Sequence, residues 1–328
     1  MTQSVNSVLG PIAPEKLGVT LMHEHLVFGY PGWQYDSAAP SYNREKAFEV
    51  CCAMVGEAMS HGLKTVVDAT PNDGHRDPEL YKMVADKTGV NIICSTGLYT
   101  EEEGAPAYFK FRRNLTGGSP AITNEVYETF MKDITQGIDG TGVKAGVIKV
   151  ATGRGEITPY EEMVLEAAAM AQKETGVPII THTEAGTMGP QQADFLIGQG
   201  ADSSRLMVGH MCGNADLNYS IEVLKKGVYA SYDRFGLNIF MPDTQRTETV
   251  IGLIKQGFEK QIMLSQDFIC FWLGRELPLM EPLLPMIANW NLTNIFKNII
   301  PTLKNAGITD DQINTIMAEN PRRLFSAS

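Results

Sequence analysis

The sequence predicts a (β/α)₈ barrel, formed by residues 1–328 as a single domain with long βα loops at its C-terminal face. Eight short hydrophobic segments alternate with segments whose apolar residues recur at helical spacing. Strands that are hydrophobic on both faces are typical of a parallel sheet covered by helices. Eight such units suit the chain, since barrels of this kind take about 250 residues before insertions. A doubly wound open sheet is the alternative, but no Gly-x-Gly-x-x-Gly sequence follows the first strand.

The predicted elements follow one another with short connections. The strands are predicted over residues 18–27, 64–70, 91–99, 144–152, 178–183, 205–210, 228–234 and 261–267. The helices are predicted over residues 44–60, 77–87, 124–138, 158–175, 191–199, 218–226, 244–258, 290–303 and 310–318. Asn43 and Pro159 are residue types that begin helices, and Gly89 and Gly176 are typical of helix ends. Asn320-Pro321 is predicted to end the last helix.

Composition narrows the class of partner. The formal net charge is −11 and there is no run of Lys and Arg, so we expect neither a nucleic acid nor a membrane surface as partner. No apolar run approaches the roughly 18 residues of a membrane span, and the first ten residues do not resemble a signal peptide. We therefore expect a cytoplasmic protein. The five cysteines lack Cys-x-x-Cys spacing, and Cys51, Cys52 and Cys94 are predicted to be core residues.

Four of the six histidines fall at predicted strand ends. His23 and His25 would project from one face of the first strand and Glu24 from the other, because side chains alternate along a strand. Such a pair alone could be two polar residues at a strand terminus, or half of a metal site. His182 and His210 end the fifth and sixth strands, at the barrel face where active sites form.

Asp267 ends the predicted eighth strand, two β/α units beyond His210. The four histidines and Asp267 would therefore converge on one mouth, where imidazoles and a carboxylate suit Zn²⁺, Mn²⁺, Co²⁺ or Fe²⁺. Lys149 is the only charged residue in the segment 145–152. Taken alone, Lys149 would reach solvent or a carboxylate, because an unpaired buried ammonium group is costly.

This ordered set, on strands one, four, five, six and eight, resembles the binuclear amidohydrolase superfamily. Four segments are closer still to its phosphotriesterase branch, and the resemblance spans essentially the whole chain. They are LGVTLMHEH at 17–25, AGVIKVAT at 145–152, VPIITHT at 177–183 and ENPRR at 319–323.

The resemblance implies two divalent transition-metal ions per chain, zinc first among the candidates. Lys149 would be N6-carboxylysine, bridging the two metals. His23, His25 and Asp267 would hold the more buried metal, and His182 and His210 the outer one. A hydroxide between the metals would be the nucleophile, Asp267 would also be the general base, and the outer metal would polarise the scissile C=O or P=O.

Tyr99 in STGLY and Arg234 in YDRFG resemble residues that border the lactone site of phosphotriesterase-like lactonases. Alone, Tyr99 could be a packing residue at the rim, and Arg234 the partner of Asp233 or another carboxylate. The long loop 268–287 resembles a loop that forms an acyl-chain channel in those lactonases. Its Trp272, with Leu237, Phe240 and Trp290, could line such a channel, or pack the loop or a dimer interface.

The resemblance implies a hydrolase of lactones, either N-acyl-homoserine lactones or other γ/δ-lactones, with promiscuous phosphotriesterase activity. The alternative is another phosphoester or carboxylic ester in the same site. A mononuclear deaminase-like enzyme fits less well because of Lys149, and a metal-stabilised binding protein would not need Asp267 as a base. The resemblance also implies a homodimer.

Three features depart from the family pattern or have no role in it. Gln266 stands where many relatives have His or Asn, so the surroundings of the outer metal could differ. His75, in the loop after the second strand, is predicted to be exposed. The aromatic segment 28–33 (FGYPGW) could narrow the pocket and favour a particular acyl group.

Overall fold

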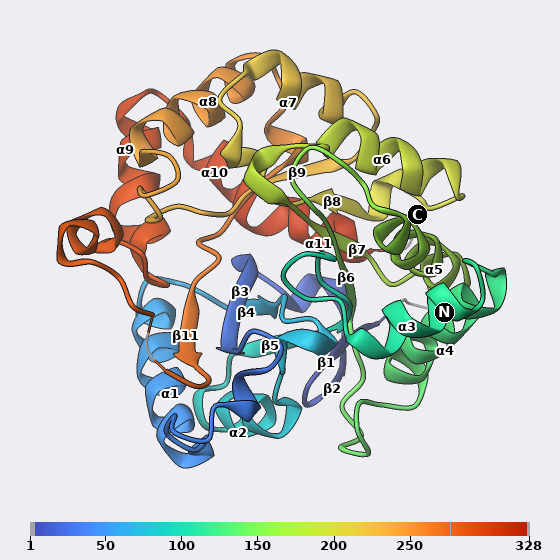
Figure 1. The fold of residues 1–328 in the computed structure, drawn as a ribbon. Coiled ribbons are helices and arrows are strands. Elements are labelled where there is room, and N and C mark those ends of the chain that lie inside the picture. Colours follow the sequence, from blue (N-terminus) through green and yellow to red (C-terminus); the bar gives the residue numbers. More distant parts are fainter. Residues whose placement is uncertain (1–3, 276, 327–328) are drawn as a thin grey trace.

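The computed structural model describes residues 4–275 and 277–326, so residue 276 of the predicted long loop and the chain ends lie outside the described residues. Nine parallel strands form one curled sheet in the order β10-β9-β8-β7-β6-β5-β4-β3-β11 (Figure 1). Their bounds are β3 Thr20–Phe28, β4 Thr65–Asp68, β5 Asn91–Gly97, β6 Val147–Thr152, β7 Ile179–Thr183, β8 Leu206–Val208, β9 Tyr229–Tyr232, β10 Ile262–Leu264 and β11 Ile269–Trp272. From β3 to β10, strands that follow one another in the chain are neighbours in the sheet, as expected for a barrel.

The sheet curls round until its last segment meets its first strand. β10 pairs with β9, and β11, in the same segment, pairs with β3. Between them the Asp267 amide donates to the His23 carbonyl at 3.0 Å, and the His25 amide donates to the Phe268 carbonyl at 2.8 Å. The architecture is therefore the predicted α/β class, a TIM-like barrel.

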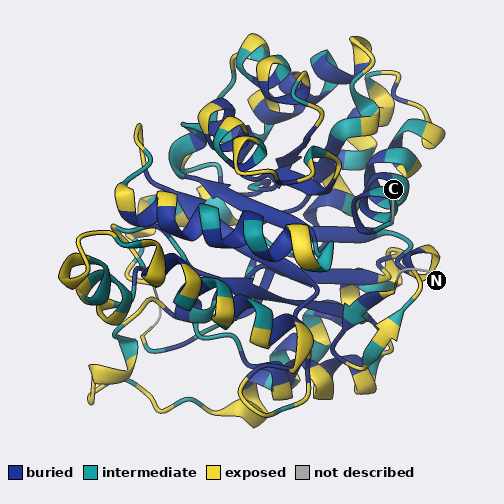
Figure 2. Ribbon diagram, turned by 90° about the vertical axis from the view of Figure 1, so that its right-hand side faces the viewer, coloured by how far each residue is buried: buried dark blue, intermediate teal, exposed yellow. Residues whose placement is uncertain are grey.

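Helices cover the outside of the sheet (Figure 1). They are α1 Arg44–Ser60, α2 Pro78–Thr88, α3 Ala107–Leu115, α4 Pro120–Thr135, α5 Pro159–Thr175, α6 Gly189–Gly198, α7 Leu217–Leu224, α8 Asp243–Lys255, α9 Ile300–Asn305, α10 Asp310–Asn314 and α11 Asn320–Phe325. Figure 2 shows the buried strands in the centre and exposed residues on the outer faces of the helices. Among the described residues, no helix combines the length and apolar character needed to cross a bilayer.

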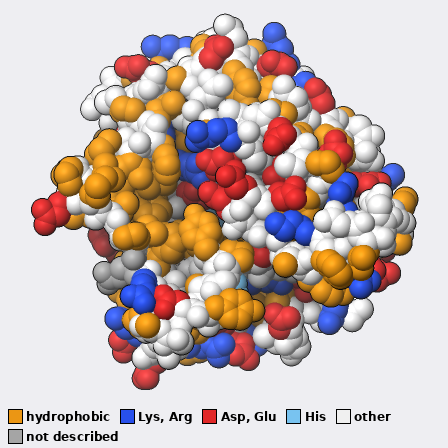
Figure 3. Space-filling model, viewed as in Figure 1, with side chains coloured by type: hydrophobic (Ala, Val, Ile, Leu, Met, Phe, Trp, Pro, Cys, Tyr) orange, Lys and Arg blue, Asp and Glu red, His pale blue; other side chains and the backbone are white. Residues whose placement is uncertain are grey.

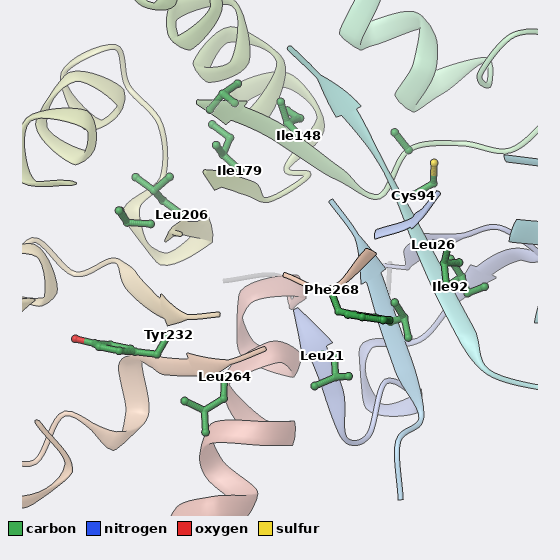
Figure 4. Packing of buried hydrophobic residues seen from close by; sticks show 14 of the residues in the cluster. Leu21, Leu26, Ile92, Cys94, Ile148, Ile179, Leu206, Tyr232, Leu264 and Phe268 are labelled. Atoms are coloured by element: carbon green, nitrogen blue, oxygen red, sulfur yellow. The ribbon is translucent and has the colours of Figure 1, made fainter. Parts of the chain in front are cut away.

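Two hydrophobic layers hold the barrel together. The larger lies between the sheet and the helices and includes Leu21, Ile148 and Leu264 (Figure 4). The smaller fills the barrel interior, where Val147 and Ile180 meet side chains of the other strands and Leu324 of α11. Because side chains alternate along a strand, the next inward positions after Val147 and Ile180 are Lys149 and His182. The interior layer therefore forms the floor beneath these two side chains.

The structure departs from the predicted elements at several points. The strands β1 (Val5–Ser7) and β2 (Gly10–Ile12), the helix α3 and the strand β11 were not predicted. Asn320-Pro321 does not end the last helix: α10 continues through the π-helical residues Thr315–Glu319 into α11, and the backbone is helical at each junction. His23 and His25 lie within β3 rather than at its end. Cys51 and Cys94 are buried as predicted, whereas Cys52 is only half-buried.

Candidate active site

The predicted metal-ligand residues lie together at one mouth of the barrel. His23 and His25 come from β3, Lys149 from β6 and His182 from β7. His210 follows β8 by two residues and Asp267 follows β10 by three, so both belong to the loops that leave the strands. The four imidazoles and Lys149 are buried, and the Asp267 side chain is 13% exposed.

Asp267 is the carboxylate around which these side chains gather. Its Oδ1 lies 3.0 Å from His25 Nε2 and 3.5 Å from His23 Nε2, and its Oδ2 lies 3.7 Å from His210 Nε2. Lys149 Nζ lies 2.6 Å from His23 Nε2. The His182 and His210 rings are in contact, with centroids 4.4 Å apart. One carboxylate, one amine and four imidazoles thus surround a common point.

Two of these residues have unusual backbone conformations. His210 has φ +55° and Asp267 has φ +54°, in the left-handed region that residues other than glycine rarely adopt. Such a conformation costs about 1–2 kcal/mol per residue. In both cases it falls where the chain turns out of a strand at the mouth. Strained residues of this kind persist only where the surrounding structure holds them, and they cluster at functional sites.

Asp233, which directly follows β9, holds two of the imidazoles and was not predicted as a site residue. It is fully buried, and its two carboxylate oxygens lie 2.9 Å from His23 Nδ1 and 2.8 Å from His210 Nδ1. Its Oδ1 also accepts the His210 backbone amide at 3.0 Å. When each Nδ1 carries the proton, both Nε2 atoms are free acceptors that face the mouth. In the sequence, Asp233 was considered only as a partner for Arg234.

The other two imidazoles are also held through one nitrogen. Thr70 Oγ1 lies 2.8 Å from His25 Nδ1, and Glu184 Oε2 lies 2.9 Å from His182 Nε2. His25 therefore presents Nε2 to the mouth, and His182 presents Nδ1. Hydrogen bonds of this kind fix the tautomer and orientation of histidines that bind metals. The sequence offers little to identify Thr70 and Glu184, because both are common polar residues in loops.

Burial sets the charge of the cluster. It lowers the pKa of His23 and of His210, and it lowers the pKa of His182 to about 4, so these imidazoles are neutral at pH 7. Burial also lowers the pKa of Lys149 to about 8. For Asp267 burial acts in the opposite sense, but the nearby imidazoles and Arg234 hold its pKa well below its usual range.

This donor set fits divalent transition-metal ions. Neutral imidazole nitrogens and an ionised carboxylate are the forms that bind Zn²⁺ and related ions. Among the described residues, His23, His25 and Asp267 form one group whose ligand atoms are close enough to share an ion, and His23, His210 and Asp233 form another. In the second group Asp233 contacts the Nδ1 atoms, so we regard it as the residue that orients the two imidazoles.

A cavity of about 270 Å³ opens beside the cluster. The residues predicted to contact substrate all line it: Tyr99, Arg234, Leu237, Phe240, Trp272 and Trp290. Figure 3 shows the hollow on this face, with hydrophobic side chains along one side and acidic ones on the other. The cavity therefore joins a polar end at the imidazoles to a mainly apolar wall.

Tyr99 and Arg234 lie at the polar end of the cavity. The Tyr99 hydroxyl is 3.4 Å from His182 Nδ1, and the Tyr99 amide donates to the Asp73 carboxylate. Arg234 Nε donates to Asp267 Oδ2 at 3.0 Å, and its guanidinium group lies over the ring of Phe240. Arg234 thus pairs with a carboxylate, as its alternative interpretation expected, but that carboxylate is Asp267 and the pair lines the cavity.

The structure also places the residues that departed from the family pattern. The Gln266 side chain donates to the Asn291 carbonyl at 2.8 Å, so its amide group is taken up outside the imidazole cluster. His75 was predicted to be exposed, but it is half-buried, because its ring contacts Trp33 and its Nδ1 lies 3.2 Å from the Gly29 carbonyl. From the aromatic segment, Phe28 and Tyr30 line the cavity and both contact Trp272.

Known proteins resemble this chain over nearly its whole length. A model of the phosphotriesterase family matches residues 3–325. The aryldialkylphosphatase of Saccharolobus solfataricus is 36% identical over 322 residues, which cover 96% of this chain and 97% of that protein. The structure of an organophosphorus hydrolase from Deinococcus radiodurans matches with a TM-score of 0.96 and 43% identity, covering 99% of this chain and 97% of its own. A mutant of a PTE-like lactonase from Deinococcus radiodurans matches with a TM-score of 0.95 and 42% identity, covering 98% of this chain and 100% of its own. The chain therefore belongs to the phosphotriesterase family, and it is a metal-dependent hydrolase of ester bonds.

Proposed function

We propose that this hydrolase opens lactones, with N-acyl-homoserine lactones or other γ/δ-lactones as substrates and phosphotriesters as slow, promiscuous ones. The observation that carries the proposal is a single cavity that combines the imidazole cluster, Tyr99 and Arg234 with an apolar wall. A lactone ring is compact and polar, whereas an acyl chain needs apolar surface. The similarity to a PTE-like lactonase at 42% identity supports the same choice.

The apolar wall fits the acyl part of such a substrate. Ile269, Leu277, Leu279 and Ile287 line the cavity together with Trp272. Burying each methylene group of a chain contributes about 0.8 kcal/mol. We therefore expect affinity to rise with chain length until the chain reaches solvent.

The polar end of the cavity would bind and orient the ester group. The Tyr99 hydroxyl can donate to a carbonyl or ring oxygen beside His182. The guanidinium group of Arg234 keeps further N–H donors beyond the one that pairs with Asp267, and these can contact the ring oxygen. Both side chains would hold the ring with its carbonyl carbon toward the cluster.

We propose two metal ions in this cluster, held by His23, His25, His182, His210 and Asp267, with Lys149 as a shared ligand after carboxylation. The ions would supply Lewis acidity toward the carbonyl and acidify a bound water. Asp267 would accept the proton of the attacking water at a carboxylate oxygen. As the carbonyl carbon gains the water oxygen and loses the ring oxygen, that proton would pass to the leaving alkoxide, and the product is a hydroxy acid.

Carboxylation of Lys149 requires its neutral amine. The amine attacks CO₂, a nitrogen–carbon bond forms, and one proton is released as the carbamate appears. Burial lowers the pKa of Lys149 to about 8, which raises the neutral fraction at physiological pH. The carbamate would replace a buried cation with an anion among four imidazoles, and this favours metal binding electrostatically.

A substrate panel tests the proposal. Lactones of increasing acyl-chain length, aryl dialkyl phosphotriesters and simple carboxylic esters would be compared by kcat/KM on the zinc-loaded enzyme. We expect the lactones to exceed the phosphotriesters by at least about 100-fold, the scale that one misplaced reacting group can cost. If phosphotriesters or carboxylic esters instead have the highest kcat/KM, the lactonase assignment is wrong.

A further inference from the structure

Glu24 lies between His23 and His25 in the sequence, but its side chain points away from them. It is fully buried on β3, and in the parallel pairing it lies opposite Asp68 of β4. None of the described ion pairs gives it a Lys or Arg partner. A buried carboxylate without a cation is costly unless hydrogen bonds compensate. The hydrogen bonds of the Glu24 side chain therefore indicate its role.

The three hydrogen bonds that the structure gives the Glu24 side chain all go to the segment 265–268, between β10 and β11. Oε1 accepts the Ser265 hydroxyl at 2.7 Å and the Gln266 amide at 2.9 Å. Oε2 accepts the Phe268 amide at 2.8 Å. These partners are the neighbours of Asp267 on both sides. The side chain of Glu24 therefore binds the backbone before and after the residue whose carboxylate lies near three of the imidazoles and Arg234.

The backbone of this segment is strained, and the hydrogen bonds to Glu24 stabilise it. Asp267 has φ +54°, and the two backbone amides that Glu24 accepts flank this strained residue. The Ser265 hydroxyl also accepts the His23 amide at 3.0 Å, which links the segment to β3 a second time. On the other side the Trp290 indole donates to the Gln266 carbonyl at 2.9 Å. The backbone beside Asp267 is thus held by side chains from two directions.

The three neighbours of Glu24 all act as donors. The two backbone amides can only donate, and the Ser265 hydroxyl already accepts from His23, so it offers its proton to Glu24. Glu24 therefore binds the segment 265–268 through both of its side-chain oxygens as acceptors.

We propose that Glu24 is a positioning residue for Asp267: it fixes the backbone at 265–268 so that the Asp267 carboxylate faces the imidazole cluster. Glu24 contacts neither the cluster nor the cavity and acts only through the segment it binds. The inference rests on the proposed function, in which Asp267 is a metal ligand and base. It predicts that loss of Glu24 weakens metal binding even when the fold persists.

The test compares Glu24→Gln with Glu161→Gln. The glutamine keeps the size of Glu24, but it replaces one acceptor oxygen with an NH₂ group, which then faces one or more of the three donors. Glu161 is a matched control: it is also buried, and it accepts three backbone amides, those of Glu101, Gly153 and Thr158. Both changes should lower the resistance of the apoprotein to urea. Only Glu24→Gln should lower zinc affinity, by about 10- to 100-fold, with kcat falling more than KM changes.

A double-mutant cycle with Asp267→Asn separates positioning from general damage. If Glu24 acts through Asp267, Glu24→Gln should lower zinc affinity less than threefold further in the Asp267→Asn background. Full additivity would overturn the proposal, as would a Glu24→Gln protein whose zinc affinity matches that of Glu161→Gln. Failure of the proposed function would appear separately, as an Asp267→Asn protein with normal zinc affinity and turnover.

Ser265→Ala keeps the proposal testable if Glu24→Gln does not fold. It removes one of the three donors to Glu24, together with the acceptor of the His23 amide, and leaves both backbone amides on Glu24. We expect zinc affinity, measured by equilibrium competition with a chelator, to fall by about two- to fivefold. This loss is smaller than the one expected when a whole orienting side chain is removed. Unchanged zinc affinity in a folded Ser265→Ala protein would contradict the role of Glu24.

Discussion

Replacement of Asp233 by asparagine should weaken metal binding, because Asp233 holds two of the imidazoles at once. Asp233 accepts His23 Nδ1 at 2.9 Å and His210 Nδ1 at 2.8 Å, and it is fully buried. An asparagine offers one oxygen and one NH₂ group, so one of the two imidazoles would face a donor. That ring would have to accept at Nδ1 and carry its proton on Nε2, the nitrogen that faces the mouth, and a metal ion would then have to displace this proton.

The size of the effect follows from these contacts. A hydrogen bond to a charged group contributes about 1.5–3 kcal/mol, and the substitution removes the charge and one of the two imidazole bonds. Residues that orient metal ligands typically account for about 10- to 100-fold in metal affinity, which corresponds to about 1.4–2.7 kcal/mol. We expect Asp233→Asn to fall in this range.

The measurement is zinc affinity by competition with a chelator, together with metal analysis after dialysis. Asp133→Asn is the control, because Asp133 is a buried carboxylate on α4 that accepts Arg76 and Thr96 away from the imidazole cluster. Both variants should lose stability against urea, but only Asp233→Asn should lose zinc affinity. If its zinc affinity stays within threefold of the wild-type value, the orienting role of Asp233 is refuted.

Three further changes test other parts of the site. Lys149→Ala should bind fewer than two ions per chain by metal analysis, and adding a short carboxylic acid should partly restore the bound metal. Two bound ions without the added acid would exclude a bridging role for the lysine. Asp73 has its pKa raised by burial from 3.8 to about 6, so its ionisation opposes folding as pH rises. Wild-type stability should therefore fall by about 3 kcal/mol between pH 3 and 7 relative to Asp73→Asn, whose unfolding free energy should lack this slope. Trp272→Ala should lower kcat/KM about tenfold for long-chain lactones and little for short ones, since an apolar contact of about 1.5 kcal/mol is lost, and equal losses would contradict an acyl-binding role.

The barrel and the positions of the proposed metal-ligand residues could be predicted from the sequence because both depend on strong, local signals. Buried parallel strands are hydrophobic throughout, and the helix Arg44–Ser60 has the predicted bounds, with the Asn43 side chain at its start. The short strands β1 and β2 could not be predicted, since three residues carry no periodicity. The strand β11 was hidden in a long loop, because its pairing with β3 depends on how the barrel closes.

The residues that orient the site were missed for a different reason. Strand alternation shows that Glu24 points away from His23 and His25, but it does not show which chain segment lies there. That segment is 265–268, which reaches β3 only when the eighth strand closes the barrel onto the first. Asp233 likewise meets His23 across the same closure.

Both carboxylates are next to residues already identified from the sequence, Glu24 beside two histidines and Asp233 beside Arg234. Each is fully buried and each makes at least three hydrogen bonds to the site or to its backbone. In a barrel, a charged residue that alternates with a ligand cannot reach solvent, so it must bind a neighbouring strand or loop. A buried acid adjacent to a predicted site residue is therefore a candidate for orienting the site, and its partner belongs to the strand or loop that the topology places beside it.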